Sequence, residues 1–127
     1  MFINHTHHDS RNWSTGQLEA AHAYGSIQDL ASPEIPADWN ETEVLQLAET
    51  YAARLIAMQP KAVLCQGEFT YTYALVDILT QAGIPVLAAC SERQTIEKTD
   101  ESGNTYRTSI FKFVQFRCYA TKKQNQY

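Results

Sequence analysis

The sequence has few of the features that mark a membrane or secreted protein. No apolar stretch approaches the roughly 20 residues that a membrane-spanning helix needs. Residues 1–5 contain neither a basic region nor a long apolar region, so we expect no secretory signal. Cysteine occurs three times, an odd number, and no C-x-x-C pair is present. We therefore expect a reduced, cytoplasmic protein that does not enter a membrane.

Charged residues are also scarce, at 19%, and the net charge is −4 at pH 7. An acidic balance argues against a protein that coats long nucleic acid, but it allows a small phosphorylated ligand in a locally polar pocket. The 127 residues are 44% hydrophobic, which is typical of a globular domain with its own core. Because no repeat or low-complexity linker divides the chain, we expect one domain over residues 1–119 and a polar tail over residues 120–127.

Apolar periodicity and turn residues predict alternating strands and helices. Gly25 and Gly83 end two of the helices, and Pro33 and Pro36 make residues 31–40 a loop. Three consecutive β-α-β steps require a mainly parallel sheet with helices on both faces. The predicted strands are 2–4, 26–30, 62–65 and 85–90, and the predicted helices are 16–24, about 41–58 and 69–81.

A β-hairpin is expected after the last of these strands. Residues 94–99 and 105–119 are β-rich and are joined by a polar turn that contains glycine. Strict alternation in the second segment places Phe111 and Phe113 on one face and Phe116 on the other. The predicted fold class is therefore α/β, with a mainly parallel sheet flanked by helices and a C-terminal β-hairpin.

Polar residues follow three of the predicted strands, where α/β proteins bind their ligands. These are residues 5–10, 66–70 and 91–93, and we expect them to converge at one edge of the sheet. Residues 66–70 combine a glycine with a helix start that presents free N–H groups to an anion, or they form a tight turn with a capping residue. Arg93 suits bidentate phosphate binding, although its triplet can also form a surface salt bridge.

The histidines after the first strand allow a second interpretation. His5, His7 and Asp9 match the first part of an H-x-H-x-D motif, whose side chains bind zinc or another transition metal. Metallo-hydrolases continue this motif with a histidine, whereas this chain has Ser10, and His22 lies inside a predicted helix. We therefore expect no metal and no other cofactor, and instead either a loop histidine that contacts the ligand or a solvated polar loop.

Four short segments occur in an informative order: Asn4-His5, Gln66-Gly-Glu-Phe-Thr70, Ser91-Glu92-Arg93 and Phe113-Val-Gln-Phe-Arg-Cys-Tyr119. With them, roughly residues 2 to 119 resemble the small standalone CRISPR-associated ring nucleases of type III systems. The resemblance implies a Rossmann-like fold related to CARF sensor domains. It also implies a homodimer that binds a cyclic oligoadenylate, with cyclic tetraadenylate as the expected ring.

Members of that family are thought to cut the ring without a metal, which switches off an antiviral second messenger. A ribose 2′-hydroxyl attacks the adjacent phosphate, so the protein must align the reacting atoms and stabilise charge on the phosphate. The resemblance implies that His5 or Glu68 transfers the proton and that Arg93 stabilises the charge. Together with the predicted sheet edge, it gives these ligand-binding residues: Asn4, Ser10, Gln66, Gly67, Phe69, Thr70, Ser91, Glu92 and Arg117.

Three other functions fit the same sequence. A non-catalytic sensor or sequestering protein of this fold would bind the cyclic nucleotide and release no linear product. A metal-dependent phosphodiesterase using the N-terminal histidine cluster would lose its activity in EDTA. A structural or interaction protein would show no shift in melting temperature when nucleotide is added.

Overall fold

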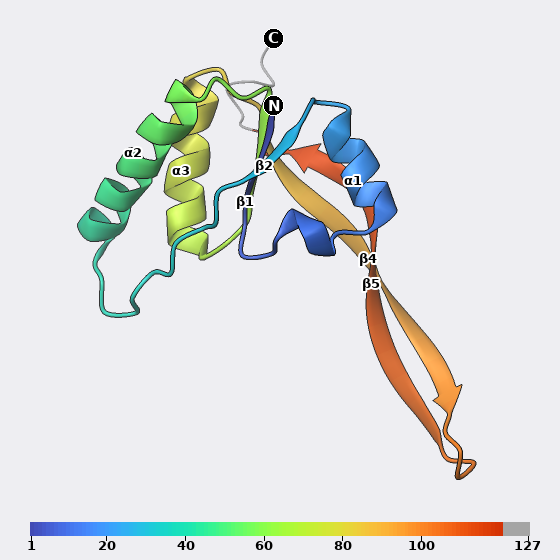
Figure 1. Ribbon diagram of the computed structural model, residues 1–127. Coiled ribbons are helices and arrows are strands. Elements are labelled where there is room, and N and C mark those ends of the chain that lie inside the picture. Colours follow the sequence, from blue (N-terminus) through green and yellow to red (C-terminus); the bar gives the residue numbers. More distant parts are fainter. Residues whose placement is uncertain (121–127) are drawn as a thin grey trace.

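Figure 1 shows the computed structural model of the protein, which describes residues 1–120. The predicted tail over residues 120–127 lies, apart from its first residue, outside this range. No helix in the described part of the chain is long and apolar enough to cross a bilayer. The strands are β1 Phe2–His5, β2 Ile27–Asp29, β3 Ala62–Cys65, β4 Val86–Thr99 and β5 Thr105–Cys118, and the helices are α1 Thr15–His22, α2 Glu41–Ala57, α3 Phe69–Gln81 and the 3-10 turn η1 Ser10–Asn12.

The strands form one sheet in the order β2-β1-β3-β4-β5. Strands β1 to β4 are parallel to one another, and β5 pairs with β4 in the antiparallel sense. Helix α1 covers one face of the sheet, while α2 and α3 cover the other (Figure 1). The predicted α/β class, with a mainly parallel sheet and a C-terminal hairpin, is therefore confirmed. Because β2 and β3 lie on opposite sides of β1, the topological switch point lies between β1 and β3.

Two hydrophobic clusters, one on each face, hold the sheet in place. On β1, Phe2 belongs to the cluster under α1 and Ile3 to the cluster under α2 and α3, and both are fully buried. On β3, Leu64 joins the first cluster and Val63 the second. Each such side chain contributes about 1.5–3 kcal/mol when fully buried. This packing fixes the carboxyl ends of β1 and β3, where the candidate site begins.

The fourth strand is longer than the sequence predicts. The expectation that it ends at Cys90, with a loop over residues 91–93, is wrong because β4 continues to Thr99. β5 pairs with β4 along this whole length. Backbone hydrogen bonds hold the two strands together, so the side chains of this exposed ribbon can be polar. Residues 91–113 project from the body as this ribbon, and we call them the arm (Figure 1).

A β-bulge at the base of the arm changes which side chains share a face. The pairing register shifts directly after Cys90, where Val114 is an extra residue of β5. Phe113 and Phe116 therefore lie on the same face, and their ring centroids are 5.0 Å apart. The strict alternation expected from the sequence, which separated these two rings, is wrong because it does not allow for an inserted residue.

Candidate ligand cavity at the switch point

An open cavity of about 1200 Å³ lies at the carboxyl ends of β1 and β3, over the switch point. It is larger than the roughly 300–1,000 Å³ of most small-molecule pockets. Its walls are the loop after β1, the start of α1, the loop after β3 and the base of the arm. The lining residues are Thr6, His7, His8, Asn12, Trp13, Ser14, Thr15, Gly16, Gln17, Leu64, Gln66, Gly67, Ala89, Ser91, Ile110, Phe111, Lys112 and Phe113.

None of the described residues that line the cavity is acidic, although the chain has 14 Asp and Glu residues against 10 Lys and Arg residues. The ionisable lining residues are instead His7, His8 and Lys112. The first turn of α1 also lies in the wall, and its N-terminal peptide groups carry a partial positive charge. The cavity therefore favours an anion within a protein whose net charge is negative.

The loop after β1, which carries two lining histidines, is held from below by a buried asparagine. Asn4 is 2% exposed, and its Nδ2 donates to the backbone oxygen of His8 at 2.8 Å and to Oδ1 of Asp29 at 2.7 Å. Its Oδ1 accepts a hydrogen bond from the Thr6 hydroxyl at 2.8 Å. Asn4 was expected to bind the ligand, but it lies beneath the cavity and positions the loop instead.

The predicted catalytic residue His5 also lies away from the cavity. It is fully buried, with Nδ1 2.6 Å from the backbone oxygen of Leu30 and Nε2 2.7 Å from the Tyr71 hydroxyl. Because a carbonyl only accepts, Nδ1 carries the proton and Nε2 accepts from Tyr71. Burial lowers the pKa of His5, which favours this neutral form. The prediction that His5 transfers a proton to or from the ligand is therefore wrong, and its role is structural.

His7 is one of the two histidines that line the cavity. Its side chain is 38% exposed, and its Nδ1 lies 3.8 Å from Oε1 of Glu34, which forms an ion pair when the ring is protonated. Its Nε2 lies 3.5 Å from the position that a Cβ on Gly67 would occupy, and that Cβ would lie only 2.9 Å from Oγ of Ser32. Gly67 is therefore needed where the loop after β3 meets the segments that carry His7 and Ser32.

Three of the predicted ligand-binding residues, Gln66, Gly67 and Ser91, line the cavity together. Oε1 of Gln66 accepts a hydrogen bond from the backbone N–H of Ala89 at 2.9 Å, which ties the end of β3 to β4. Ser91 is the first residue of the arm and lies two positions beyond Ala89 on the same strand. The end of β3 and Ser91 therefore lie at one cavity, although Ser91 lies within β4 rather than at its end.

The remaining residues of the glycine turn lie outside the cavity lining. Glu68 caps α3: one carboxylate oxygen accepts from the Thr70 hydroxyl at 2.6 Å and from the backbone N–H of Tyr71 at 2.8 Å. The bond from Thr70, followed by that from Tyr71, lowers the pKa of Glu68. Phe69 is 90% exposed on the outer surface of α3. The alternative interpretation of this segment, a turn with a capping residue, therefore describes its C-terminal half.

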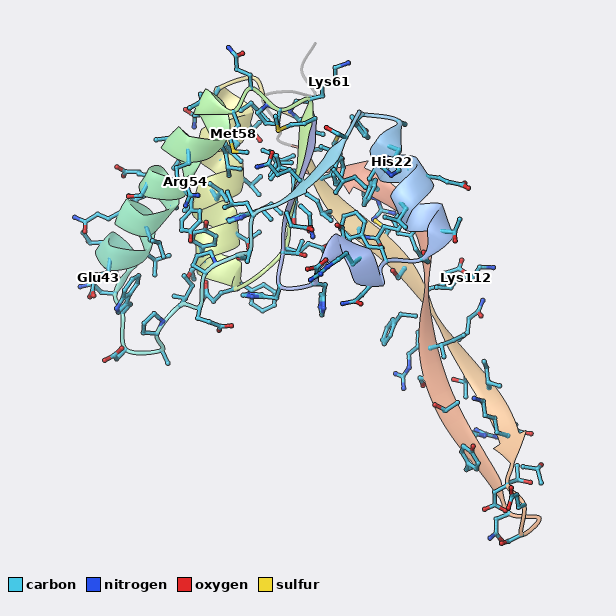
Figure 2. The ribbon with its side chains drawn as sticks, viewed as in Figure 1. His22, Glu43, Arg54, Met58, Lys61 and Lys112 are labelled. Atoms are coloured by element: carbon cyan, nitrogen blue, oxygen red, sulfur yellow. The ribbon has the colours of Figure 1, made fainter. Side chains whose placement is uncertain are left out.

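Three further predicted ligand contacts are not part of the cavity lining. The Ser10 hydroxyl donates to Oδ2 of Asp29 at 2.8 Å, so it ties η1 to the end of β2. Glu92 is exposed and lies opposite Lys112 in the ladder, at the base of the arm (Figure 2). Arg117 is exposed near the end of β5, opposite Ala88. The sequence placed these residues near a ligand only because they follow or end predicted strands.

Arg93 lies within β4 rather than in a loop, and it is not among the residues that line the cavity. It pairs with Phe111 across the arm, and residues directly opposite each other in a ladder share a face. Arg93 therefore shares a face of the ribbon with Phe111, and it lies two residues beyond Ser91 toward the tip of the arm. Its Nε donates to Oγ of Ser109 at 3.1 Å, which leaves the two terminal nitrogens of the guanidinium for other partners.

The geometry gives no support to the metal interpretation of the N-terminal histidine cluster. Both nitrogens of His5 are engaged inside the protein, and the Asp9 carboxylate accepts from the Arg11 guanidinium at 2.9 Å. Over residues 1–120, no group of three or more His, Cys, Asp or Glu side chains is placed to hold a metal ion. His5, His7 and Asp9 therefore do not form the proposed ligand set.

The sequence interpretation missed two walls of the cavity. One is the start of α1, where Ser14 caps the helix by accepting from the backbone N–H of Gln17. Nothing in the sequence places Ser14 opposite the loop after β3. The other wall contains Phe111 and Phe113, which the bulge turns toward α1. The run of aromatic residues in β5 could have suggested an aromatic wall, but the sequence did not predict which face of the strand these side chains occupy.

Fold and cavity together define an α/β protein with an open cavity, free of acidic lining residues, at its switch point. A protein-family model described as the Uncharacterized protein MJ1673 family matches residues 1–117. Because the match spans nearly the whole sequence, the chain belongs to this family. Neither the comparison with curated proteins nor that with solved structures gave a significant match.

Proposed function

We propose that this protein is a ring nuclease that binds a cyclic oligoadenylate, with cyclic tetraadenylate as the expected substrate, and cleaves it without a metal. The observation that carries the proposal is the acid-free cavity at the switch point, which holds His7 and His8 beside the loop after β3. The strand order also suits a Rossmann-like fold related to CARF domains. In this proposal the protein acts in the cytoplasm and switches off type III CRISPR signalling.

The reaction needs a proton acceptor, a proton donor and stabilisation of phosphate charge. The 2′-oxygen of one ribose forms a bond to the adjacent phosphorus while the bond from phosphorus to the 5′-oxygen breaks. One proton leaves the 2′-hydroxyl and one proton reaches the departing 5′-oxygen, giving a 2′,3′-cyclic phosphate and a free 5′-hydroxyl. We assign proton transfer to His7, because it is exposed to the cavity and has a carboxylate, Glu34, near its other nitrogen.

Arg93 is the proposed cation for the scissile phosphate. It shares a face of the arm with Phe111, which lines the cavity, and its terminal nitrogens suit bidentate contact with phosphate oxygens. The N-terminal peptide groups of α1 and the backbone around Gly67 would contact neighbouring phosphates of the ring. Glu68 is not part of this assignment because its carboxylate is occupied as the cap of α3.

We also propose that the protein acts as a homodimer. A ring of four identical nucleotides has two-fold symmetry, so two copies of one chain can each hold half of it around a shared axis. The open mouth of the cavity suits a ligand that extends beyond one protomer. Light scattering on the purified protein should give twice the mass of one chain, and a monomer in the presence of saturating ligand would contradict this arrangement.

The decisive experiment is incubation of the purified protein with cyclic tetraadenylate in excess EDTA. We expect linear products with 2′,3′-cyclic phosphate ends. Tight binding without a product would identify a non-catalytic sensor, and the absence of both binding and cleavage would refute the proposed function. Activity that disappears in EDTA would point to a metal-dependent phosphodiesterase and would likewise contradict the proposal.

Matched variants test the residue assignments. His7→Ala should slow cleavage by about 10²- to 10⁴-fold, the usual contribution of a general acid or base. His22→Ala is the control, because His22 is exposed in the last turn of α1, outside the cavity lining (Figure 2). Arg93→Ala should slow cleavage with little loss of stability. Arg107→Ala is its control, since Arg107 lies farther along the arm and pairs with Glu97 at 3.4 Å.

A further inference from the structure

The base of the arm carries aromatic side chains that line the cavity, and one of them, Phe111, is largely exposed. Phe111 is 73% exposed although it lines the cavity. Phe113 lies beside it on the same face and is half-buried against Phe116. Trp13 faces the same cavity from the start of α1, and its ring is fixed by an edge contact with Phe116 at 6.4 Å. Aromatic rings therefore line one side of an anion-favouring cavity.

The bulge at Val114 is responsible for this arrangement. Without the extra residue, alternation from Phe116 would turn Phe111 and Phe113 to the opposite face of the ribbon, away from α1. β-Bulges commonly reorient side chains next to binding sites. Here the shift turns two rings into the cavity, and it leaves Phe111 largely exposed rather than packed in the core.

We infer that Phe111, supported by Phe113, is a stacking platform for a nucleobase of the ligand, and that it determines preference for base-bearing over base-free phosphodiesters. Each nucleobase has an apolar π-face and joins a charged phosphodiester, which matches a wall of aromatic rings beside cationic side chains. Arg93 lies opposite Phe111 in the ladder, and Lys112 lines the same cavity, so cationic side chains lie near this ring. The identity of the ligand as a cyclic oligoadenylate rests on the proposed function, whereas stacking of a base on Phe111 does not.

The test measures binding of three probes by isothermal titration calorimetry. These are cyclic tetra-2′-deoxyadenylate, which lacks the attacking hydroxyl and is not cleaved, linear tetraadenylate, and an abasic ribose-phosphate tetramer. Phe111→Ala should weaken binding of the base-bearing probes by about 5- to 150-fold, as expected for loss of one base–aromatic stack. Phe111→Tyr should restore binding, and the affinity for the abasic tetramer should not change.

Tyr106→Ala is the matched control, because Tyr106 is an exposed aromatic residue of the same arm that is 49% exposed and not part of the cavity lining. It should bind all three probes as the wild type does. Equal affinity of Phe111→Ala and wild type for the base-bearing probes would overturn the inference and leave the proposed function intact. Phe111-dependent binding of the linear probe alone would support the stacking platform and contradict the ring-nuclease proposal. Failure of the wild type to bind either base-bearing probe would overturn both.

Discussion

Removing the Tyr71 hydroxyl tests the structural role of the buried histidine directly. Tyr71 and His5 are both fully buried, and the hydroxyl donates to Nε2 at 2.7 Å. Tyr71→Phe keeps the ring and its packing but leaves Nε2 without a donor in a site that is closed to water. An unsatisfied buried acceptor costs about 1–3 kcal/mol, so the free energy of unfolding should fall by about that amount.

Urea denaturation at pH 7.5 measures this change, and thermal melting gives an independent value. For a domain of this size the melting temperature should fall by roughly 3–5 °C for each kcal/mol. Tyr73→Phe is the control, because Tyr73 is 80% exposed and should change stability by less than about 0.5 kcal/mol. Equal stability of Tyr71→Phe and wild type would show that the bond to His5 contributes nothing, and the structural role of His5 would be refuted.

The same histidine predicts how stability depends on pH. Burial lowers the pKa of His5 from its ordinary value of 6.5, so between the two pKa values the unfolded chain binds more protons than the folded protein. Stability should therefore be greatest above pH 6.5 and should decline as the pH falls, by up to about 1.4 kcal/mol per pH unit from this group. His5→Gln should be less stable at pH 7.5 but should lose this part of the slope, and an unchanged slope would contradict the assignment.

Three further predictions concern the loop after β3 and the cysteines. Glu68→Ala should lower the free energy of unfolding by about 0.5–2 kcal/mol, the usual cost of losing a helix cap. Urea denaturation should show this difference from the wild type vanish as the pH falls below 4.5 and through the lowered pKa of Glu68, because the carboxyl is then protonated in both states. Gly67→Ala should lower the melting temperature because its Cβ would lie 2.9 Å from Oγ of Ser32, and Ser32→Ala in the same chain should recover part of the loss; additive effects would contradict the contact. Cys65 should not react with a thiol reagent at pH 8 in the folded protein, since burial raises its pKa to about 12, whereas the exposed Cys118 should react; equal labelling by mass spectrometry would refute this.

Local signals in the sequence were sufficient for the central fold. Short apolar runs such as residues 62–65 are buried on both faces, and Gly25 and Gly83 stop the helices that precede two strands. The bounds of β3 and α3 agree with the prediction because an apolar run, a cap and a glycine follow one another directly. Capping and periodicity depend on neighbours within a few positions, so they can be recognised without any tertiary contact.

The formation of the arm as two paired strands, rather than a loop, depends on pairing between segments that are distant in the sequence. Ser91 and Arg93 are polar and follow an apolar run, so the sequence alone favoured a loop. They lie in a strand because β5 pairs with β4 along its full length. The insertion of Val114 has no local signature, yet it reverses the face on which Phe111 lies.

Local patterns in the sequence were enough to predict the α/β class, the order of strands and helices, and the strand ends as the general region of the candidate site. Which of those residues line the cavity depends on contacts that form only when the chain folds. His5 and His7 are two positions apart, yet one is buried between Leu30 and Tyr71 and the other lines the cavity. The physical reason is that helix and strand preferences act between near neighbours, whereas burial and convergence depend on segments brought together only by the fold.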